Sequence, residues 1–291
     1  MVKDLLRLLR VKQYVKNVFV LAPLFFSFKF LEAAAVLQAV SAFVAFCLAA
    51  SFIYINNDIA DMEADKAHPR KRLRPLPAGR ISVFSARLVA FLLLLLALAV
   101  SCFAPVDQRF KLLLVLAAYV AVNVLYSWRL KHIAILDVFV IAAGFILRVY
   151  AGAYAIGVPV SSYIFMTTLF LSLFLGFSKR LSEAAKHKET RQVLQLYSLE
   201  GLKAYALITA ALTIMSYALY TLEAATLERF ETNRMIYSVV FVVYGIFHYL
   251  NIITTPSSEE DPTENLYRDK PLFLTCLAYL VYVFLIFVKI I

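Results

Sequence analysis

Nine apolar stretches of the sequence have lengths that suit, or nearly suit, helices crossing a lipid bilayer. A membrane-spanning helix needs about 20 predominantly apolar residues. The first candidate is the weakest because it is short and contains Pro23. Since the runs are continuous and not alternating, the sequence predicts an all-α membrane bundle of about nine transmembrane helices and excludes a strand barrel. The candidates are residues 17–30, 34–56, 81–103, 110–127, 133–152, 161–178, 202–221, 235–253 and 271–289.

The composition agrees with a chain that lies mostly in the membrane. Hydrophobic residues make up 63% of the 291 residues and charged residues 16%, against roughly 45–50% and about 25% in soluble domains. Cys47, Cys102 and Cys276 lie inside apolar runs, so we interpret them as packing residues. The sequence has no fixed-period repeat and no Gly/Ser-rich or Pro-rich linker. We therefore expect residues 1–291 to form one domain.

The basic residues predict the orientation of the chain. With a cytoplasmic N-terminus and nine spans, most of the 29 Lys and Arg residues fall in cytoplasmic segments, which is the positive-inside pattern. The net charge of +10 is then explained by inner loops and anionic membrane lipids, and nucleic acid is not an expected partner. We predict a multi-pass protein of the plasma membrane. The exceptions on the outer side are Lys29, Arg109, Lys111, Arg229, Arg234 and Lys289.

An acidic motif, Asn57-Asp58-x-x-Asp61-x-x-x-Asp65, continues directly from the second candidate span. If the helix continues, the three aspartates lie within about 60° of one another, and they repel unless a cation is present. Hard oxygen ligands suit Mg²⁺, which keeps waters and bridges to substrate phosphates. The alternative is a solvated helix end paired with the following basic run, but polar groups that continue a span are usually functional. We predict Asp58, Asp61 and Asp65 as metal ligands, with Asp58 and Asp61 required for catalysis.

A basic run lies in the same loop and consists of Arg70, Lys71, Arg72 and Arg74. An arginine can fork onto phosphate oxygens. Simple positive-inside anchoring is the alternative and would be the better interpretation of the run alone. Beside the acidic motif, phosphate binding becomes the better hypothesis.

Further polar residues lie at the same predicted membrane face. Tyr126 and Lys131 precede the fifth span, and Asp137 and Arg148 share one face of it, offset by about 20°. That pair is either structural or lines a polar cavity. Lys179 and Arg180 lie at the end of the sixth span. The alternative interpretation is an ordinary helix-surface pair, because Lys179 and Glu183 are four residues apart. A similar basic patch near the N-terminus comprises Arg10, Lys12, Lys16 and Asn17, and the loop from Ser257 to Lys270 is a candidate lid.

These motifs resemble those of the intramembrane prenyltransferase (UbiA) superfamily, an all-helical fold that binds diphosphates through Mg²⁺. Typical members have a second Asp-rich motif after the sixth span, where this chain has the basic segment Ser178–Glu183. The departure resembles the decaprenyl-phosphate phosphoribosyltransferase branch of that superfamily. The matching segments are Arg10–Asn17, Asn57–Pro75, Tyr126–Lys131, Arg148–Ala155 and Lys179–Glu183.

The resemblance implies a UbiA-like transferase that moves 5-phosphoribosyl from phosphoribosyl diphosphate to a polyprenyl phosphate, for cell-wall or glycolipid precursor synthesis. It also implies Mg²⁺, an active site at the cytoplasmic face and contact with membrane lipids, and it is compatible with a homo-oligomer. The alternatives are prenyl transfer to an aromatic acceptor and, more distantly, lipid transport. Transport is disfavoured because transporters place ionisable groups near the bilayer midplane. The implied substrate-binding residues are Lys16, Asn17, Asn57, Arg70, Lys71, Arg72, Arg74, Tyr126, Lys131, Asp137, Arg148, Lys179 and Arg180.

Overall fold

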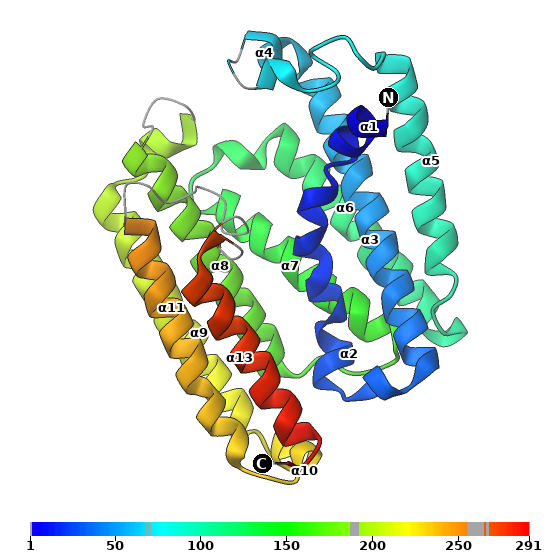
Figure 1. The fold of residues 1–291 in the computed structure, drawn as a ribbon. Coiled ribbons are helices and arrows are strands. Elements are labelled where there is room, and N and C mark those ends of the chain that lie inside the picture. The colour runs from blue at the N-terminus through cyan, green and yellow to red at the C-terminus, as the bar shows by residue number, and fades with distance from the viewer. Residues whose placement is uncertain are drawn as a thin grey trace. The chain divides into compact units, whose positions relative to one another are not determined.

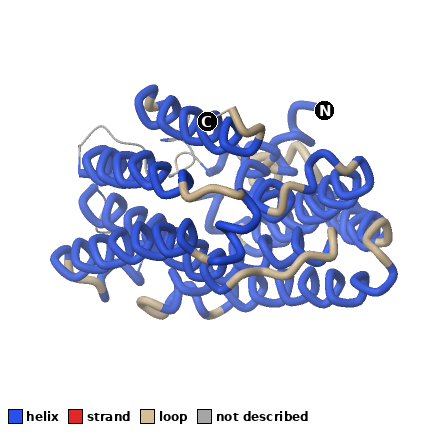
Figure 2. Tube along the Cα trace, turned by 90° about the horizontal axis from the view of Figure 1, so that it is seen from below, coloured by secondary structure: helices blue, strands red, loops and turns tan. Residues whose placement is uncertain are grey.

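Helices make up all the regular secondary structure of the described residues in this computed structural model (Figures 1 and 2). These residues are 2–67, 69, 71–186, 192–254, 265 and 268–290. Within them, 8 helices are long and apolar enough to cross a membrane. The all-α membrane bundle of about nine spans is thereby confirmed. The long helices are α3 (Ala33–Ala60), α5 (Val83–Ser101), α6 (Val106–Trp128), α7 (Leu136–Ala155), α8 (Ser162–Lys186), α9 (Leu199–Leu222), α11 (Val239–Thr254) and α13 (Lys270–Phe287). The span that contains α11 begins earlier, at Arg234, and ends at Thr254.

The first predicted span, residues 17–30, does not form one long helix. It is divided among the 3-10 helix η1 (Val11–Leu21), the short α2 (Ala22–Phe26) and η2 (Lys29–Leu31), after the N-terminal α1 (Val2–Leu9). Pro23 lies in the first turn of α2, where its missing N–H costs nothing. Phe28 has a left-handed backbone with φ 60°, which ends the helical run.

Short elements connect the long helices. Two of them matter for the site described below, because α4 (Met62–Ala67) and η3 (Lys71–Leu73) follow α3 directly. The others are η4 (Leu130–His132), η5 (Gln192–Leu196), α10 (Ala224–Phe230) and η6 (Arg234–Ser238).

The chain divides into two compact units. The first unit comprises Met1–Leu130 and Gly144–Val160, and the second comprises Lys131–Ala143 and Ser161–Ile291. Helix α7 therefore contributes its first turns to the second unit and its remainder to the first. A single domain over residues 1–291 stays a prediction, and each unit is described by itself.

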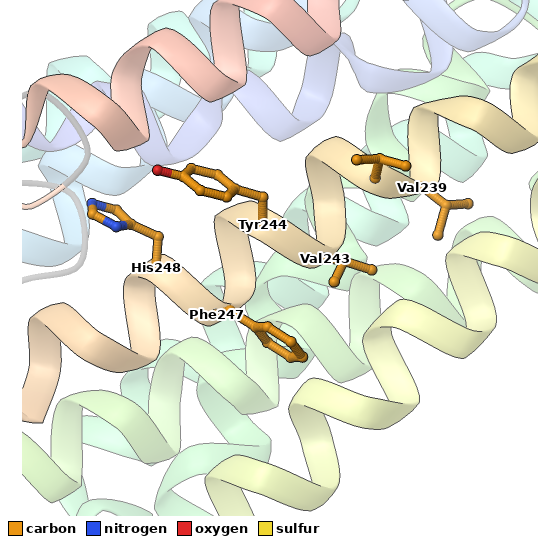
Figure 3. A pocket seen from close by; sticks show the side chains of 6 residues that line it. Val239, Val243, Tyr244, Phe247 and His248 are labelled. Atoms are coloured by element: carbon orange, nitrogen blue, oxygen red, sulfur yellow. The ribbon is translucent and has the colours of Figure 1, made fainter.

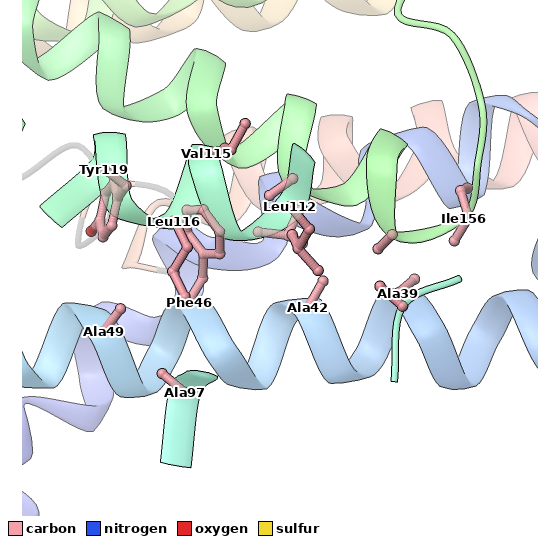
Figure 4. Packing of buried hydrophobic residues seen from close by; sticks show 14 of the residues in the cluster. Ala39, Ala42, Phe46, Ala49, Ala97, Leu112, Val115, Leu116, Tyr119 and Ile156 are labelled. Atoms are coloured by element: carbon pink, nitrogen blue, oxygen red, sulfur yellow. The ribbon is translucent and has the colours of Figure 1, made fainter. Parts of the chain in front are cut away.

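Small residues on α3 bring the helices of the first unit close together. Its core contains Ala39, Ala42 and Ala49 of α3, which Figure 4 shows on one side of that helix with aromatic and aliphatic side chains of α6 opposite. Small side chains let helix backbones approach closely inside membranes. Gly152 of α7 serves the same purpose, because a Cβ there would lie 1.8 Å from the backbone oxygen of Val20 in η1. The sequence therefore fixes η1 against α7.

The second unit has a more aromatic core built on α8 and α9. Phe174 and Phe177 of α8 pack against Tyr249 of α11 and Tyr205 of α9, with ring centroids 5.6 and 5.1 Å apart respectively. Gly176 makes room for the start of α7, because a Cβ there would meet Val138 Cγ1 at 2.5 Å. This contact holds the first turns of α7 against α8.

Candidate active site

The acidic motif lies where α3 ends and α4 begins. Asp61 is the C-cap of α3, with φ −90° and ψ 4°, so the helix is interrupted at this residue. The break places Asp61 in an exposed position, whereas Asp58 and Asp65 are each only 2% exposed. The prediction that all three carboxylates share a face depended on a continuous helix. In the structure, two of the three are buried together.

Arg74 joins the two buried carboxylates. Its Nη1 donates to Asp58 Oδ1 at 3.1 Å and to Asp65 Oδ2 at 2.6 Å. Arg10, which has a left-handed backbone before η1, also donates to Asp58 Oδ1 and lies 4.9 Å from the ring centroid of Tyr54. The acidic and basic motifs of the sequence thus meet in the first unit, and the N-terminal basic patch contributes a second arginine.

The two buried carboxylates suit a divalent cation whose remaining ligands come from water and a substrate. No group of three His, Cys, Asp or Glu side chains that could hold a metal ion occurs among the described residues. Asp58 and Asp65 nevertheless direct hard oxygens at one positively charged nitrogen of Arg74. Mg²⁺ typically uses one or two protein carboxylates and takes its remaining ligands from water and phosphates. The carboxylate oxygens of Asp58 and Asp65 are therefore chemically suitable ligands for Mg²⁺. Asp61, the third aspartate of the motif, is exposed.

The loop that carries Arg74 is anchored from both sides. Arg80 donates from Nη2 to the backbone oxygen of Leu73 at 2.6 Å, and its Nε lies 3.1 Å from Asp4 Oδ1. Arg72 is exposed. Arg70 lies outside the described residues, as does the side chain of Lys71, so their predicted phosphate contacts stay predictions.

The shared helix face suggested a pair between Arg148 and Asp137, but the structure does not contain it. It is 6% exposed and donates to three neutral oxygens of the first unit: Asn17 Oδ1 at 2.7 Å, the Gly144 backbone oxygen at 2.8 Å and Tyr119 Oη at 2.8 Å. Among the described residues, no carboxylate lies within ion-pair distance of it. Arg148 therefore ties η1, α6 and α7 together through neutral dipoles.

Asp137 instead belongs to a buried ionic network in the second unit. Arg180 is 1% exposed and donates from Nε to Asp137 Oδ2 at 2.7 Å and from Nη1 to Glu183 Oε2 at 2.6 Å. Tyr197 Oη donates to Asp137 Oδ1 at 2.7 Å and accepts from the Ile135 N–H. Burial, and then the hydrogen bond to Asp137, raise the pKa of Tyr197, which keeps it a neutral donor. Arg180 is thus held by two carboxylates.

Tyr197 was not among the residues predicted from sequence. Tyr197 follows η5 in a segment without a recognisable motif. The only sequence signal for it is its position just before the helix that begins at Leu199. The other predicted residues lie at element ends or in short helices. Tyr126 is near the end of α6, Lys131 is in η4, Lys179 is in α8, Lys16 is in η1 and Asn57 is in α3. Most of the candidate lid, Ser257–Lys270, lies outside the described residues.

An apolar groove of about 520 Å³ runs along α11 in the second unit (Figure 3). Val243 and Phe247 line it, with Tyr244 stacked on His248 at a centroid distance of 5.6 Å. His248 Nε2 lies 2.9 Å from Asp269 Oδ1. All the residues that line it belong to α11, and none of them is a predicted site residue.

Helices long and apolar enough to cross a membrane, with buried carboxylates and arginines paired at the end of α3, define the class of this protein as a helical membrane protein with a polar site. The chain belongs to the UbiA prenyltransferase family, whose sequence model matches residues 19–277. The predicted superfamily is thereby confirmed.

The chain is similar to named enzymes and to a solved structure of the same family. The chain is 31% identical to the decaprenyl-phosphate phosphoribosyltransferase of Mycolicibacterium smegmatis, over 96% of this chain and 91% of that protein. It is also 31% identical to the enzyme of the same name from Mycobacterium tuberculosis, over 96% of this chain and 93% of that protein. A UbiA homologue from Archaeoglobus fulgidus, solved with GPP and Mg²⁺, has the same fold, with a TM-score of 0.74 and 22% identity over 98% of this chain and 99% of that one.

Proposed function

We propose that this enzyme transfers a 5-phosphoribosyl group from phosphoribosyl diphosphate to a polyprenyl phosphate and releases diphosphate. The observation that carries the proposal is 31% identity, over 96% of the chain, to transferases named for a decaprenyl-phosphate acceptor. The grouping of arginines with buried carboxylates in the first unit supports it, because both substrates carry phosphate. The basic Lys179, in a segment where the resembled superfamily typically has acids, favours this reaction over ordinary prenyl transfer.

The donor is held by acids and arginines of the first unit. Asp58, Asp65 and the exposed Asp61 would hold Mg²⁺, which would supply positive charge to the diphosphate of the donor. Arg10 and Arg74 both contact the Asp58 carboxylate, and in the proposal they bind oxygens of the leaving diphosphate. Arginine suits this task because its planar fork matches a phosphate.

The chain itself contributes mainly position and charge. The attacking oxygen belongs to a phosphate monoester, which carries about −1.5 to −2 charges at pH 7, so no general base is required. Catalysis then consists of aligning the two substrates and stabilising the departing diphosphate. Attack on ribose C1 opposite the leaving group, through an oxocarbenium-like transition state, gives inversion at that carbon.

The cations of the second unit have different roles in the proposal. Lys131 and Lys179 are assigned to substrate phosphate oxygens. Arg180 is assigned a positioning role, because Asp137 and Glu183 already bind its guanidinium. The lipid tail lies in an apolar groove between helices, and the site opens to the cytoplasmic face of the plasma membrane.

The decisive experiment uses membranes that contain the overproduced protein. Labelled phosphoribosyl diphosphate is supplied with polyprenyl phosphates of several lengths, and label is measured in the lipid fraction. The second candidate is prenyl transfer to an aromatic acceptor, and membership of the UbiA prenyltransferase family favours it. A parallel assay supplies labelled prenyl diphosphate with 4-hydroxybenzoate. Labelled aromatic product without labelled phosphoribosyl lipid contradicts the proposal.

A further inference from the structure

Arg74 lies where the proposed function requires a metal ion. Its Nη1 is 3.1 Å from Asp58 Oδ1 and 2.6 Å from Asp65 Oδ2, and both aspartates are 2% exposed. Two buried carboxylates that approach one point repel each other unless a positive charge lies between them. In the structure the guanidinium of Arg74 provides that charge, and Arg10 adds a second contact at Asp58.

A metal ion and Arg74 cannot use the same pair of oxygens at once. Mg²⁺ binds carboxylate oxygens at about 2.0–2.1 Å, so an ion that bridges Asp58 Oδ1 and Asp65 Oδ2 must enter the space that Nη1 fills. Like charges against the same oxygens also repel, and more strongly in a buried site than in water. Binding of an ion between these two oxygens therefore requires the guanidinium to leave.

We propose that Arg74 is the resident counter-ion of Asp58 and Asp65 before metal binding, and that the incoming divalent cation displaces it toward the donor phosphates. The inference rests on the proposed function, because it takes these two aspartates as the metal ligands. The side chain of Arg74 is 31% exposed, so its guanidinium has a route outward. Arg80 meanwhile holds the loop at the backbone oxygen of Leu73.

This exchange predicts opposite effects of one substitution. Removing the Arg74 guanidinium should tighten metal binding, because the ion no longer has to displace a competitor. The same change should weaken binding of the donor, because a phosphate ligand is lost. A residue that only contacted the donor would leave metal affinity unchanged, and a purely structural residue would weaken both.

The test is a titration of Mn²⁺, as the probe ion, into the purified full-length protein in detergent without donor. Free Mn²⁺ is measured by electron paramagnetic resonance. Arg74→Gln should lower the Mn²⁺ dissociation constant at least tenfold, which corresponds to about 1.4 kcal/mol. Arg87→Gln removes one positive charge at an exposed position of α5 in the same unit, and should change the constant far less. Arg74→Lys keeps a charge but cannot fork, and should give an intermediate value.

Three other results overturn the inference. If Arg74→Gln and the wild type bind Mn²⁺ equally while Asp58→Asn abolishes binding, the exchange is wrong and the metal site of the proposed function stands. If Arg87→Gln gains as much affinity as Arg74→Gln, only net charge matters. If neither the wild type nor Arg74→Gln binds Mn²⁺, the metal assignment fails together with the inference.

Discussion

Replacing Arg180 should destabilise the protein far more than replacing its neighbour Lys179. Arg180 is 1% exposed, with Nε 2.7 Å from Asp137 Oδ2 and Nη1 2.6 Å from Glu183 Oε2. Arg180→Met would leave two buried carboxylates without this cation. Removing one partner of a buried ion pair costs about 3–5 kcal/mol. Lys179→Met changes a partly exposed side chain and should cost no more than about 1 kcal/mol.

The assay is loss of helical circular dichroism on heating in detergent, with a second substitution as the internal control. Asp137→Asn added to Arg180→Met removes one of the two unbalanced charges. The double variant should therefore melt at a higher temperature than Arg180→Met alone. The donor KM of the folded fraction should stay near the wild-type value, because a positioning residue does not contact phosphate.

Two results would refute this reasoning. If Arg180→Met and Lys179→Met melt at the same temperature, the ionic network contributes nothing to stability. If Arg180→Met keeps the wild-type melting temperature while its donor KM rises tenfold, Arg180 is a direct phosphate ligand.

Three further predictions concern the first unit. Asp58→Asn or Asp61→Asn should nearly abolish transfer in a folded protein, and EDTA should stop the wild-type reaction until Mg²⁺ is restored; full activity in both variants would refute the metal assignment. Neutralising the cations of residues 70–74 one at a time should raise the donor KM at least tenfold, or about 1.4 kcal/mol, in one or more variants, whereas four normal values would make the run a topological anchor. Tyr119→Phe removes an acceptor from buried Arg148 and should lower stability by about 1–3 kcal/mol, measured by thermal melting; an unchanged melting temperature would show that the bond contributes little.

The long helices could be predicted from sequence because a bilayer-spanning helix leaves a strong signal in continuous apolar length. The first candidate shows the limit of that signal. Residues 17–30 are apolar, but the left-handed Phe28 and the 3-10 geometry of η1 depend on packing against α7 at Gly152. That packing is a tertiary contact, and hydropathy along the chain carries no information about it.

The side-chain partners within the site were harder to predict than the residues themselves. Helical periodicity predicts that Asp137 and Arg148 lie near one face of α7, but eleven residues span about 16 Å along the axis, too far for an ion pair. Each therefore takes partners from other elements, Arg180 for Asp137 and Asn17 for Arg148. Helical periodicity identifies candidate site residues, but the tertiary structure determines which side chains they contact.

The buried Arg148 also explains how an N-terminal arginine reaches the acidic motif. A cation inside a membrane helix is costly and is retained where it has a task. Here its bond to Asn17, together with the close backbone approach at Gly152, fixes η1 against α7. Arg10 lies immediately before η1, and its left-handed backbone directs the chain so that its guanidinium meets Asp58. Arg148 thus helps to position Arg10, which contacts the proposed metal ligand Asp58. Losing the Arg148 side chain should therefore displace Arg10.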